Sequence, residues 1–367
     1  MLSLVAEAGA TLVPLQHHDR PARLTARADF LVPGGDEVPY TKPWLSIDDQ
    51  IGILRRRGLV IPDVERAAAV LHEVGYYRLT GYLYPLRQSH TVIDERGRAS
   101  VVVEEQYRVT ARFDHACELI AFDRALRLLV LEAVERVEVA IRTRLAHVLG
   151  RLSPFAHEDP AAFSAAFTAS GSDPDRRSEH QRWLGRLEDR KGRSDESFVT
   201  HFRDRYDGHM PVWVVVELLE LGQVSRLYGG LRNDLATEVA AAFSVPTKQL
   251  MRSWLASVNY VRNVAAHHSR LFNRKLVVAP KRPTAAQVPA LAHLGSGSAP
   301  KRFGVYEVLV VLAHLLDAVP SDEDWQVRTA ALLSSFPDID GIDVGSTGAD
   351  PAWLQEPLWN PRQTRAV

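Results

Sequence analysis

The chain has 367 residues, of which 46% are hydrophobic and 24% are charged, a composition typical of a globular protein with a sizeable apolar core. Its formal net charge is −1, which excludes attraction of nucleic acid by bulk positive charge, so any nucleic-acid site must be a local basic patch. The single cysteine, Cys117, excludes an internal disulfide and a multi-cysteine zinc site. We expect Cys117 to be a small buried apolar residue.

The sequence predicts neither a leader nor a membrane span. Residues 1–15 are mildly apolar but lack the basic leading segment of a signal peptide. No uncharged apolar stretch reaches about 18 residues. The longest apolar segments, 211–221 and 303–316, carry glutamate at helical spacing and are typical of core helices. We therefore expect a cytoplasmic protein without a membrane partner.

Ordered structure is expected to begin after a weakly ordered extension over residues 1–40, which is rich in small residues, His, Pro and Gly. Ser46 and Asp49 form a capping-box pattern that predicts a helix over 47–57. A second short helix is expected from residue 62 or 63 to 73.

A tyrosine-rich segment follows at 75–87 and fits either a strand or a helix broken at Gly81. The sequence VVVEEQY at 101–107 favours β-structure. We therefore expect a short irregular or β segment near 75–110.

The clearest helix covers 112–149, where apolar residues recur at steps of three and four. These residues are Leu119, Phe122, Leu126, Leu129, Ala133, Val137 and Ala140. Glu138 and Arg142 form an i,i+4 pair, which is more often a surface or inter-helix pair than support for an active site. Residues 151–195 turn polar and predict an exposed excursion with one charged helix at 179–191.

The remaining helices alternate with loops, so that the whole sequence predicts a mainly α protein, a helical bundle with insertions. In chain order the helices are expected at 211–221, 223–231, 235–243, 248–272, 303–319 and 322–335. We assign 41–276 to the main helical domain and 277–302 to a linker. C-terminal helices within 303–340 should pack on the bundle, and 341–367 should form a tail.

The segment 253–275 carries two stripes when it is projected at about 100° per residue. The first, within about 80°, is mostly apolar and should face the core: Trp254, Val258, Val261, Ala265, His268 and Phe272. The second, within about 60°, is polar and cationic: Asn263, His267, Arg270 and Arg274. This geometry predicts that His268 packs in the core and that His267 is the functional histidine.

The residue types of this segment suit phosphodiester chemistry. His267 can carry a proton near neutral pH, and the Arg262 guanidinium can stabilise the charge of a pentavalent phosphorane. Asn263 can orient the imidazole, and in RNA the 2′-hydroxyl supplies the nucleophile. No carboxylate cluster lies nearby in the sequence, which favours a metal-free route. Arg262 lies about 140° from His267 around an ideal helix, so the two meet only round a helix end, at a distortion or across a dimer interface.

The stretch RNVAAHHSRLFNR at 262–274 resembles the signature of the Abi-like abortive-infection proteins of the AbiD/AbiF type. It also fits the wider HEPN ribonuclease pattern, in which Arg, a polar residue and three further residues precede His. Four more blocks resemble the same family in the same order: KPWLSIDDQIGILRRRGLVI (42–61), VGYYRLTGYLYPLR (74–87), FDRALRLLVLEAVERVEVAIRTRLAH (122–147) and MPVWVVVELLELGQVSRLYGGL (210–231). The resemblance covers roughly 42–276.

The resemblance implies a HEPN-like helical bundle and metal-independent cleavage of RNA, without a cofactor. It also implies a homodimer that brings two motifs together and an antiphage role through growth arrest. Some relatives work with a small RNA, so a small regulatory RNA stays open as a further partner. Arg262 and His267 match the two catalytic positions of the family, and Asn263 matches the polar residue after the Arg.

The positions that follow match the extension of the family motif. These are His268, Arg270, Asn273 and Arg274, of which we expect Arg270, Asn273 and Arg274 to bind RNA. Phe272 stands where many relatives are expected to have Trp.

Three alternatives stay open for the cationic stripe: a solvated helix face, a dimer interface of a structural module, or a non-catalytic RNA-binding surface. The tyrosine-rich segment fits either a stacking platform for single-stranded RNA or a packing layer. Four residues at 201–209 could hold a metal ion: His201, Asp204, Asp207 and His209. Their spacing matches no standard ligand set, so we expect a solvated helix end there.

Overall fold

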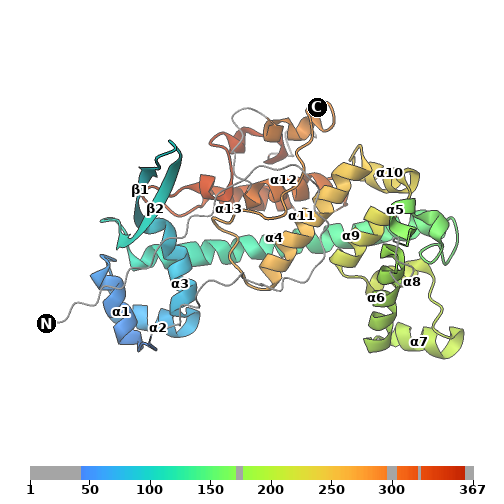
Figure 1. The fold of residues 1–367 in the computed structure, drawn as a ribbon, viewed down its shortest axis with the longest axis horizontal. Helices are drawn as coiled ribbons and strands as arrows, with labels where there is room; N and C mark the ends of the chain where they lie inside the picture. The colour runs from blue at the N-terminus through green and yellow to red at the C-terminus, as the bar shows by residue number, and fades with distance from the viewer. Residues whose placement is uncertain (1–42, 171–176, 296–303, 321–323, 360–367) are drawn as a thin grey trace. The chain divides into compact units, whose positions relative to one another are not determined.

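The structure is a computed structural model that describes residues 43–170, 177–295, 304–320 and 324–359. Contacts divide the chain into two units, residues 1–45 and 46–367, and the account below concerns the second. The predicted extension 1–40 lies outside the described residues. The second unit is mainly helical with one two-stranded antiparallel sheet, which confirms the predicted fold class (Figure 1).

Three short helices open this unit: α1 (Ile47–Arg56), α2 (Val64–Val74) and α3 (Tyr76–Leu83). The predicted capping box starts α1, because the Ser46 side chain accepts from the Asp49 backbone N–H at 3.2 Å. Gly75 joins α2 to α3 with a φ of 81°, a conformation that favours glycine. The tyrosine-rich segment is therefore helical, and Gly81 lies inside α3 without breaking it.

The two strands, β1 (Arg87–Ile93) and β2 (Ala99–Tyr107), form a hairpin that confirms the β segment predicted here. The Asp94 carboxylate closes its turn by accepting from the backbone N–H groups of Arg96 and Arg98 at 2.9 and 2.8 Å. Most side chains of the hairpin are exposed, but Tyr107 at its base is buried.

The long helix α4 (Phe113–Gly150) is the element on which the others pack, as the sequence predicted. Helices from both ends of the chain lie along it (Figure 1): α3, α8, α9, α10, α11, α12 and α13. The residues of its predicted stripe are buried or half-buried, and Leu119, Leu126 and Val137 are fully buried.

Residues 151–206 contain α5 (Ala165–Thr168), α6 (Glu179–Arg193) and α7 (Ser197–Tyr206). The exposed excursion predicted over 151–195 is correct for most of its described side chains, but it misses the packed face of α6. Trp183 and Leu187 of α6 are buried in the main core, and the Trp183 indole donates to the Gln223 carbonyl at 3.1 Å. Two large apolar side chains on one face of a charged helix are enough to bury that face.

The next helices precede the candidate site: α8 (Val212–Leu218), α9 (Leu221–Gly230), α10 (Asn233–Ala241) and α11 (Lys248–Ala266). The helix predicted over 211–221 ends earlier, because Glu220 and Gln223 form a capping box that starts α9. Arg142 of α4 donates to the Leu219 carbonyl at this break.

The C-terminal part begins with 3₁₀ turns over Pro289–Gly295 and continues with α12 (Val305–Leu316) and α13 (Trp325–Ser334). Beyond α13, further 3₁₀ turns bring Trp353 and Trp359 against Tyr306 of α12. None of the helices within the described ranges is long and apolar enough to cross a membrane.

Two apolar cores fill the part of this unit that the structure describes. One gathers α1, α2, α3 and the beginning of α4, and the other holds most of α4 with the helices from α6 onward. The segment after α11 touches both, since Leu271 belongs to the larger core and Phe272 to the smaller one. Phe336 joins the two cores, with its ring 4.8 Å from that of Phe122 and 5.9 Å from that of Phe272.

Candidate functional site

The helix α11 carries the first half of the predicted motif. Thr247 caps its N-terminus by accepting from the Leu250 backbone N–H at 3.2 Å. The helical part of the predicted core stripe is confirmed: Trp254, Val258, Val261 and Ala265 are buried. The helix ends at Ala266, however, and not at residue 272 as predicted.

The chain leaves α11 through a Schellman motif. The Ser269 N–H donates to the Val264 carbonyl at 2.9 Å and the His268 N–H to the Ala265 carbonyl at 3.0 Å. His268 occupies the left-handed position of this motif with a φ of 56°, where glycine is usual. The turn carries His268 off the helical projection and leaves it exposed, so the prediction that it packs in the core is wrong.

Arg262, Asn263 and His267 lie on the last turns of α11. Arg262 and Asn263 are half-buried, His267 is exposed, and Arg262 Nη1 donates to Asn263 Oδ1 at 3.2 Å. The His267 N–H still bonds the Asn263 carbonyl at 3.0 Å, so helical geometry holds up to His267 and keeps it about 140° from Arg262. Among the described residues, no hydrogen bond or ion pair joins Arg262 to His267.

Glu138 of α4 lies close enough to Arg262 for the two charges to interact. Burial raises the pKa of Glu138 above its ordinary value, and the charges of Arg142 and Arg262 oppose that rise. Arg142 also pairs directly with Glu138. The sequence identified Glu138 and Arg142 as an i,i+4 pair, but it did not show that this pair lies beside Arg262.

The segment after α11 is held by Asp123, a fully buried residue of α4 that the sequence reasoning missed. Asp123 Oδ1 accepts from the backbone N–H groups of Leu271 and Phe272 at 2.9 and 2.7 Å. Its other oxygen accepts from the Tyr82 hydroxyl at 2.7 Å and from Arg127. The available signal was an ionisable residue on the buried stripe of α4, four residues before an arginine.

Arg270 and Arg274 lie close together on the same segment. Arg270 is placed over the Tyr82 ring, 5.8 Å from its centroid, and burial lowers the pKa of its guanidinium. Arg274 Nε donates to the Arg270 carbonyl at 2.6 Å. Neither guanidinium forms an ion pair with any carboxylate in the described part of the chain. Two neighbouring cations without a carboxylate can bind an anion such as a phosphate.

The remaining residues of the motif divide between surface and core. Asn273 is exposed in a left-handed conformation with a φ of 48°, which asparagine tolerates. Phe272 is fully buried, as predicted, but through the loop and not through a helix face. In the tyrosine-rich segment, Tyr82 packs in the core whereas the Tyr77 side chain is 92% exposed.

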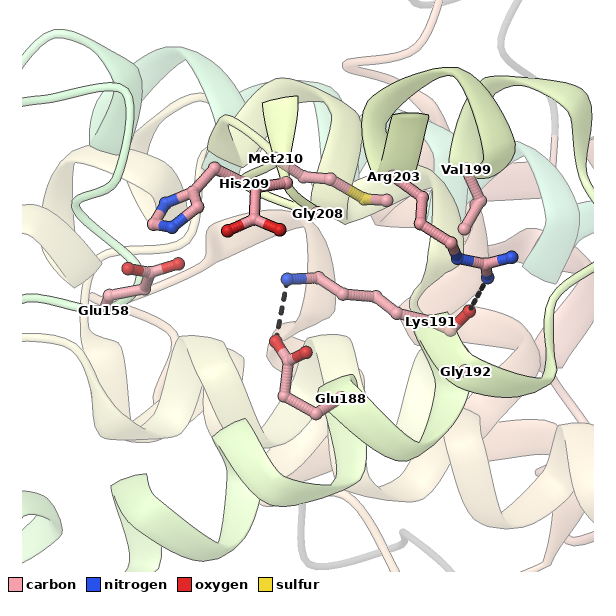
Figure 2. A pocket seen from close by; sticks show the side chains of 10 residues that line it. Glu158, Glu188, Lys191, Gly192, Val199, Arg203, Gly208, His209 and Met210 are labelled. Atoms are coloured by element: carbon pink, nitrogen blue, oxygen red, sulfur yellow. Dashed lines mark hydrogen bonds and ion pairs between the residues drawn. The ribbon is translucent and has the colours of Figure 1, made fainter. Parts of the chain in front are cut away.

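Two cavities lie away from these residues, along α6 and α7. One of about 410 Å³ is shown in Figure 2, where Lys191 reaches toward Glu188 and pairs with it at 2.7 Å, with Glu158 and His209 on the other side of its amine. A second, of about 530 Å³, is lined by the arginines of α6 at 186, 190 and 193 together with acidic residues. None of the predicted site residues lines either cavity.

The possible metal ligands at 201–209 do not form a centre. Asp207 and His209 both line the 410 Å³ cavity, where His209 stacks edge-on against Phe155 at 5.9 Å. Within the residues that the structure describes, no group of three or more His, Cys, Asp or Glu side chains could hold a metal ion.

Comparison with known proteins identifies the family of the chain. The sequence profile of a family described as Abi-like protein matches residues 69–273, more than half of the chain. The chain belongs to the Abi-like protein family. The match begins in α2 and ends inside the segment that Asp123 holds, so it contains α4, α11 and every predicted site residue except Arg274. No curated protein and no solved structure matches the chain. Membership of the Abi-like family marks it as a protein of the abortive-infection type.

Proposed function

We propose that this Abi-like protein is an antiphage endoribonuclease that cleaves RNA without a metal ion, with His267 and Arg262 as its catalytic residues. The observation that carries the proposal is the exposed imidazole of His267 at the end of α11, followed on the next segment by two guanidinium groups that form no ion pair with a described carboxylate. That set supplies a proton carrier and phosphate ligands within a few residues of each other.

The chemistry would use the 2′-hydroxyl of RNA as the nucleophile. His267 would accept the 2′-hydroxyl proton or donate a proton to the leaving 5′-oxygen, and Arg262 would stabilise the charge of the phosphorane. Asn263, which already bonds Arg262, would position that guanidinium. Arg270, Asn273 and Arg274 would bind the flanking phosphates. The products would carry a 2′,3′-cyclic phosphate and a 5′-hydroxyl.

The offset between Arg262 and His267 supports a homodimer in this mechanism. Residues that point about 140° apart on one helix can meet when the same helix of a second subunit lies beside it. The same offset favours a second candidate, an RNA-binding protein that holds a target or small regulatory RNA on the stripe without cleaving it.

The decisive experiment incubates the purified protein with end-labelled RNA and excess chelator. We expect cleavage that His267→Ala reduces by at least about 100-fold while RNA affinity stays nearly constant. His201→Ala, which removes an exposed imidazole from α7, is the matched control and should cleave normally. A 2′-deoxynucleotide at the cleavage site should block the reaction.

Other outcomes separate the alternatives. RNA binding without cleavage by the wild type would favour the binding protein. A change in oligomeric state for His267→Ala would indicate a dimer interface, and cleavage retained by His267→Ala would exclude His267 as a catalytic residue.

A further inference from the structure

The segment that carries the second half of the motif has little regular structure of its own. It contains two left-handed residues that are not glycine, His268 with a φ of 56° and Asn273 with a φ of 48°. Asparagine tolerates this conformation, but at His268 it costs free energy and persists only where the surroundings enforce it. A contact from another element must therefore help to hold residues 267–274 in place.

Asp123 provides that contact. Its carboxylate is 0% exposed and accepts from two consecutive backbone N–H groups, those of Leu271 and Phe272. It lies on α4 between Leu119 of the smaller core and Leu126 of the larger one, the same two cores that receive Phe272 and Leu271. The carboxylate thus fixes the segment at the point where the two cores meet.

Two further residues hold the carboxylate itself. The Tyr82 hydroxyl donates to Oδ2 at 2.7 Å, and burial together with the Asp123 charge raises the pKa of Tyr82 to about 12, so this proton stays on the tyrosine. Arg127 balances the negative charge through an ion pair one helical turn away. The Tyr82 ring also lies beneath Arg270, so the same residue contacts both Asp123 and the segment.

We infer that Asp123 is a positioning residue, which fixes His267 and Arg270 in position to act on RNA by holding the backbone directly after Arg270, at Leu271 and Phe272. The inference rests on the proposed ribonuclease function. Asp123 touches no substrate, so it should affect the rate of the catalytic step more than RNA affinity.

The test measures cleavage kinetics and hydrogen–deuterium exchange on the same variants. Asp123→Ala should lower kcat by about 100-fold, the size expected when a catalytic group is misplaced by about 1 Å, with a much smaller change in KM. The peptide covering 267–276 should exchange faster. Removing one partner of a buried ion pair endangers the fold, so Asp123→Asn, which keeps one acceptor for the loop, is the second variant. Circular dichroism checks that each is folded.

The controls separate positioning from general destabilisation. Asp114→Asn removes another carboxylate from α4, one paired with Arg66 and nine residues before Asp123 in the chain, and should leave kcat and exchange unchanged. Tyr82→Phe keeps the ring under Arg270 and should cause a smaller loss of kcat than Asp123→Asn. The pH optimum of RNA cleavage should be the same for every variant, because Asp123 transfers no proton in the proposed reaction.

Two results would overturn the inference: a folded Asp123→Asn and Asp123→Ala pair with normal kcat, or unchanged exchange over 267–276. Failure of the proposed function looks different, because the wild type would then cleave no RNA. In that case the hydrogen–deuterium exchange data decide. Faster exchange over 267–276 in a folded Asp123→Ala would support the positioning role, and unchanged exchange would exclude it.

Discussion

The backbone of His268 is left-handed, a conformation that strains residues with a Cβ atom but not glycine. His268→Gly should therefore stabilise the protein by about 1 kcal/mol, measured by urea denaturation. His268→Ala is the control, and it should bring no gain because it keeps the Cβ that causes the strain. Equal stability of all three proteins would contradict this account. A stabilised His268→Gly that cleaves RNA poorly would indicate that the histidine is retained for function.

His157 is fully buried, and neither ring nitrogen has a hydrogen-bond partner among the described residues, although Glu158 Oε1 lies 3.4 Å from Nε2. Burial, with the charges of Lys191 and His180, lowers the pKa of His157 to about 4. The unfolded chain binds this proton below about pH 6.5 and the folded chain only near pH 4. Acidification within that window therefore favours unfolding.

The consequence is measurable by chemical denaturation at pH 7 and pH 5. The wild type should lose about 1–2 kcal/mol more than His157→Phe over this interval, because the variant has no imidazole to protonate at that position. Parallel pH profiles for the two proteins would show that His157 is not the source.

Thr247 sets the beginning of α11, the helix that presents the candidate catalytic residues. Its hydroxyl accepts from the Leu250 N–H, so Thr247→Ala should lower the free energy of unfolding by about 1 kcal/mol. Thr247→Ser keeps the acceptor and should lie within a few tenths of a kcal/mol of the wild type. If the two variants unfold at the same urea concentration, the cap contributes nothing.

Helices could be predicted from the sequence where a long apolar periodicity is enough to define them. The stripe of α4 and the helical part of the stripe of α11 repeat every three or four residues over many turns, and both were correct. The end of α11 could not be predicted, because His268 occupies the left-handed position in which a glycine usually indicates the end of a helix. The break before Glu220 depends partly on Arg142, a residue of another helix.

At the scale of the whole molecule, the C-terminal part packs through a close backbone approach. A Cβ at Gly304, just before α12, would lie 2.6 Å from the Thr347 carbonyl carbon and 2.8 Å from the Gly348 nitrogen. Gly304→Ala should therefore destabilise the protein by about 1–3 kcal/mol in thermal or urea unfolding. It should also make residues 344–359 more sensitive to limited proteolysis.

Gly192 offers the matched control for that substitution. A Cβ there would meet nothing within 4 Å, and the residue lies in the last turn of α6. Gly192→Ala should be neutral or stabilising by up to about 1 kcal/mol, because alanine favours a helix over glycine. If both alanine variants were equally stable, the contact between Gly304 and Thr347 would not limit packing.

Long-range contacts explain what the sequence did not predict about the site. Asp123 bonds the backbone of Leu271 and Phe272 from far away in the chain, and Glu138 meets Arg262 only because α4 and α11 pack together. The candidate residues themselves could be named from their types, spacing and family resemblance. Their anchoring could not, because local periodicity carries no information on partners more than a few turns away.

The contact between Asp123 and the segment after α11 also has an evolutionary consequence. Every amino acid except proline offers a backbone N–H, so the carboxylate recognises positions 271 and 272 without recognising their side chains. A library randomised at these two positions and selected for function should return apolar residues of varied shape and exclude proline. The sequence of this segment can therefore drift between homologues while the histidine and arginines around it keep their places.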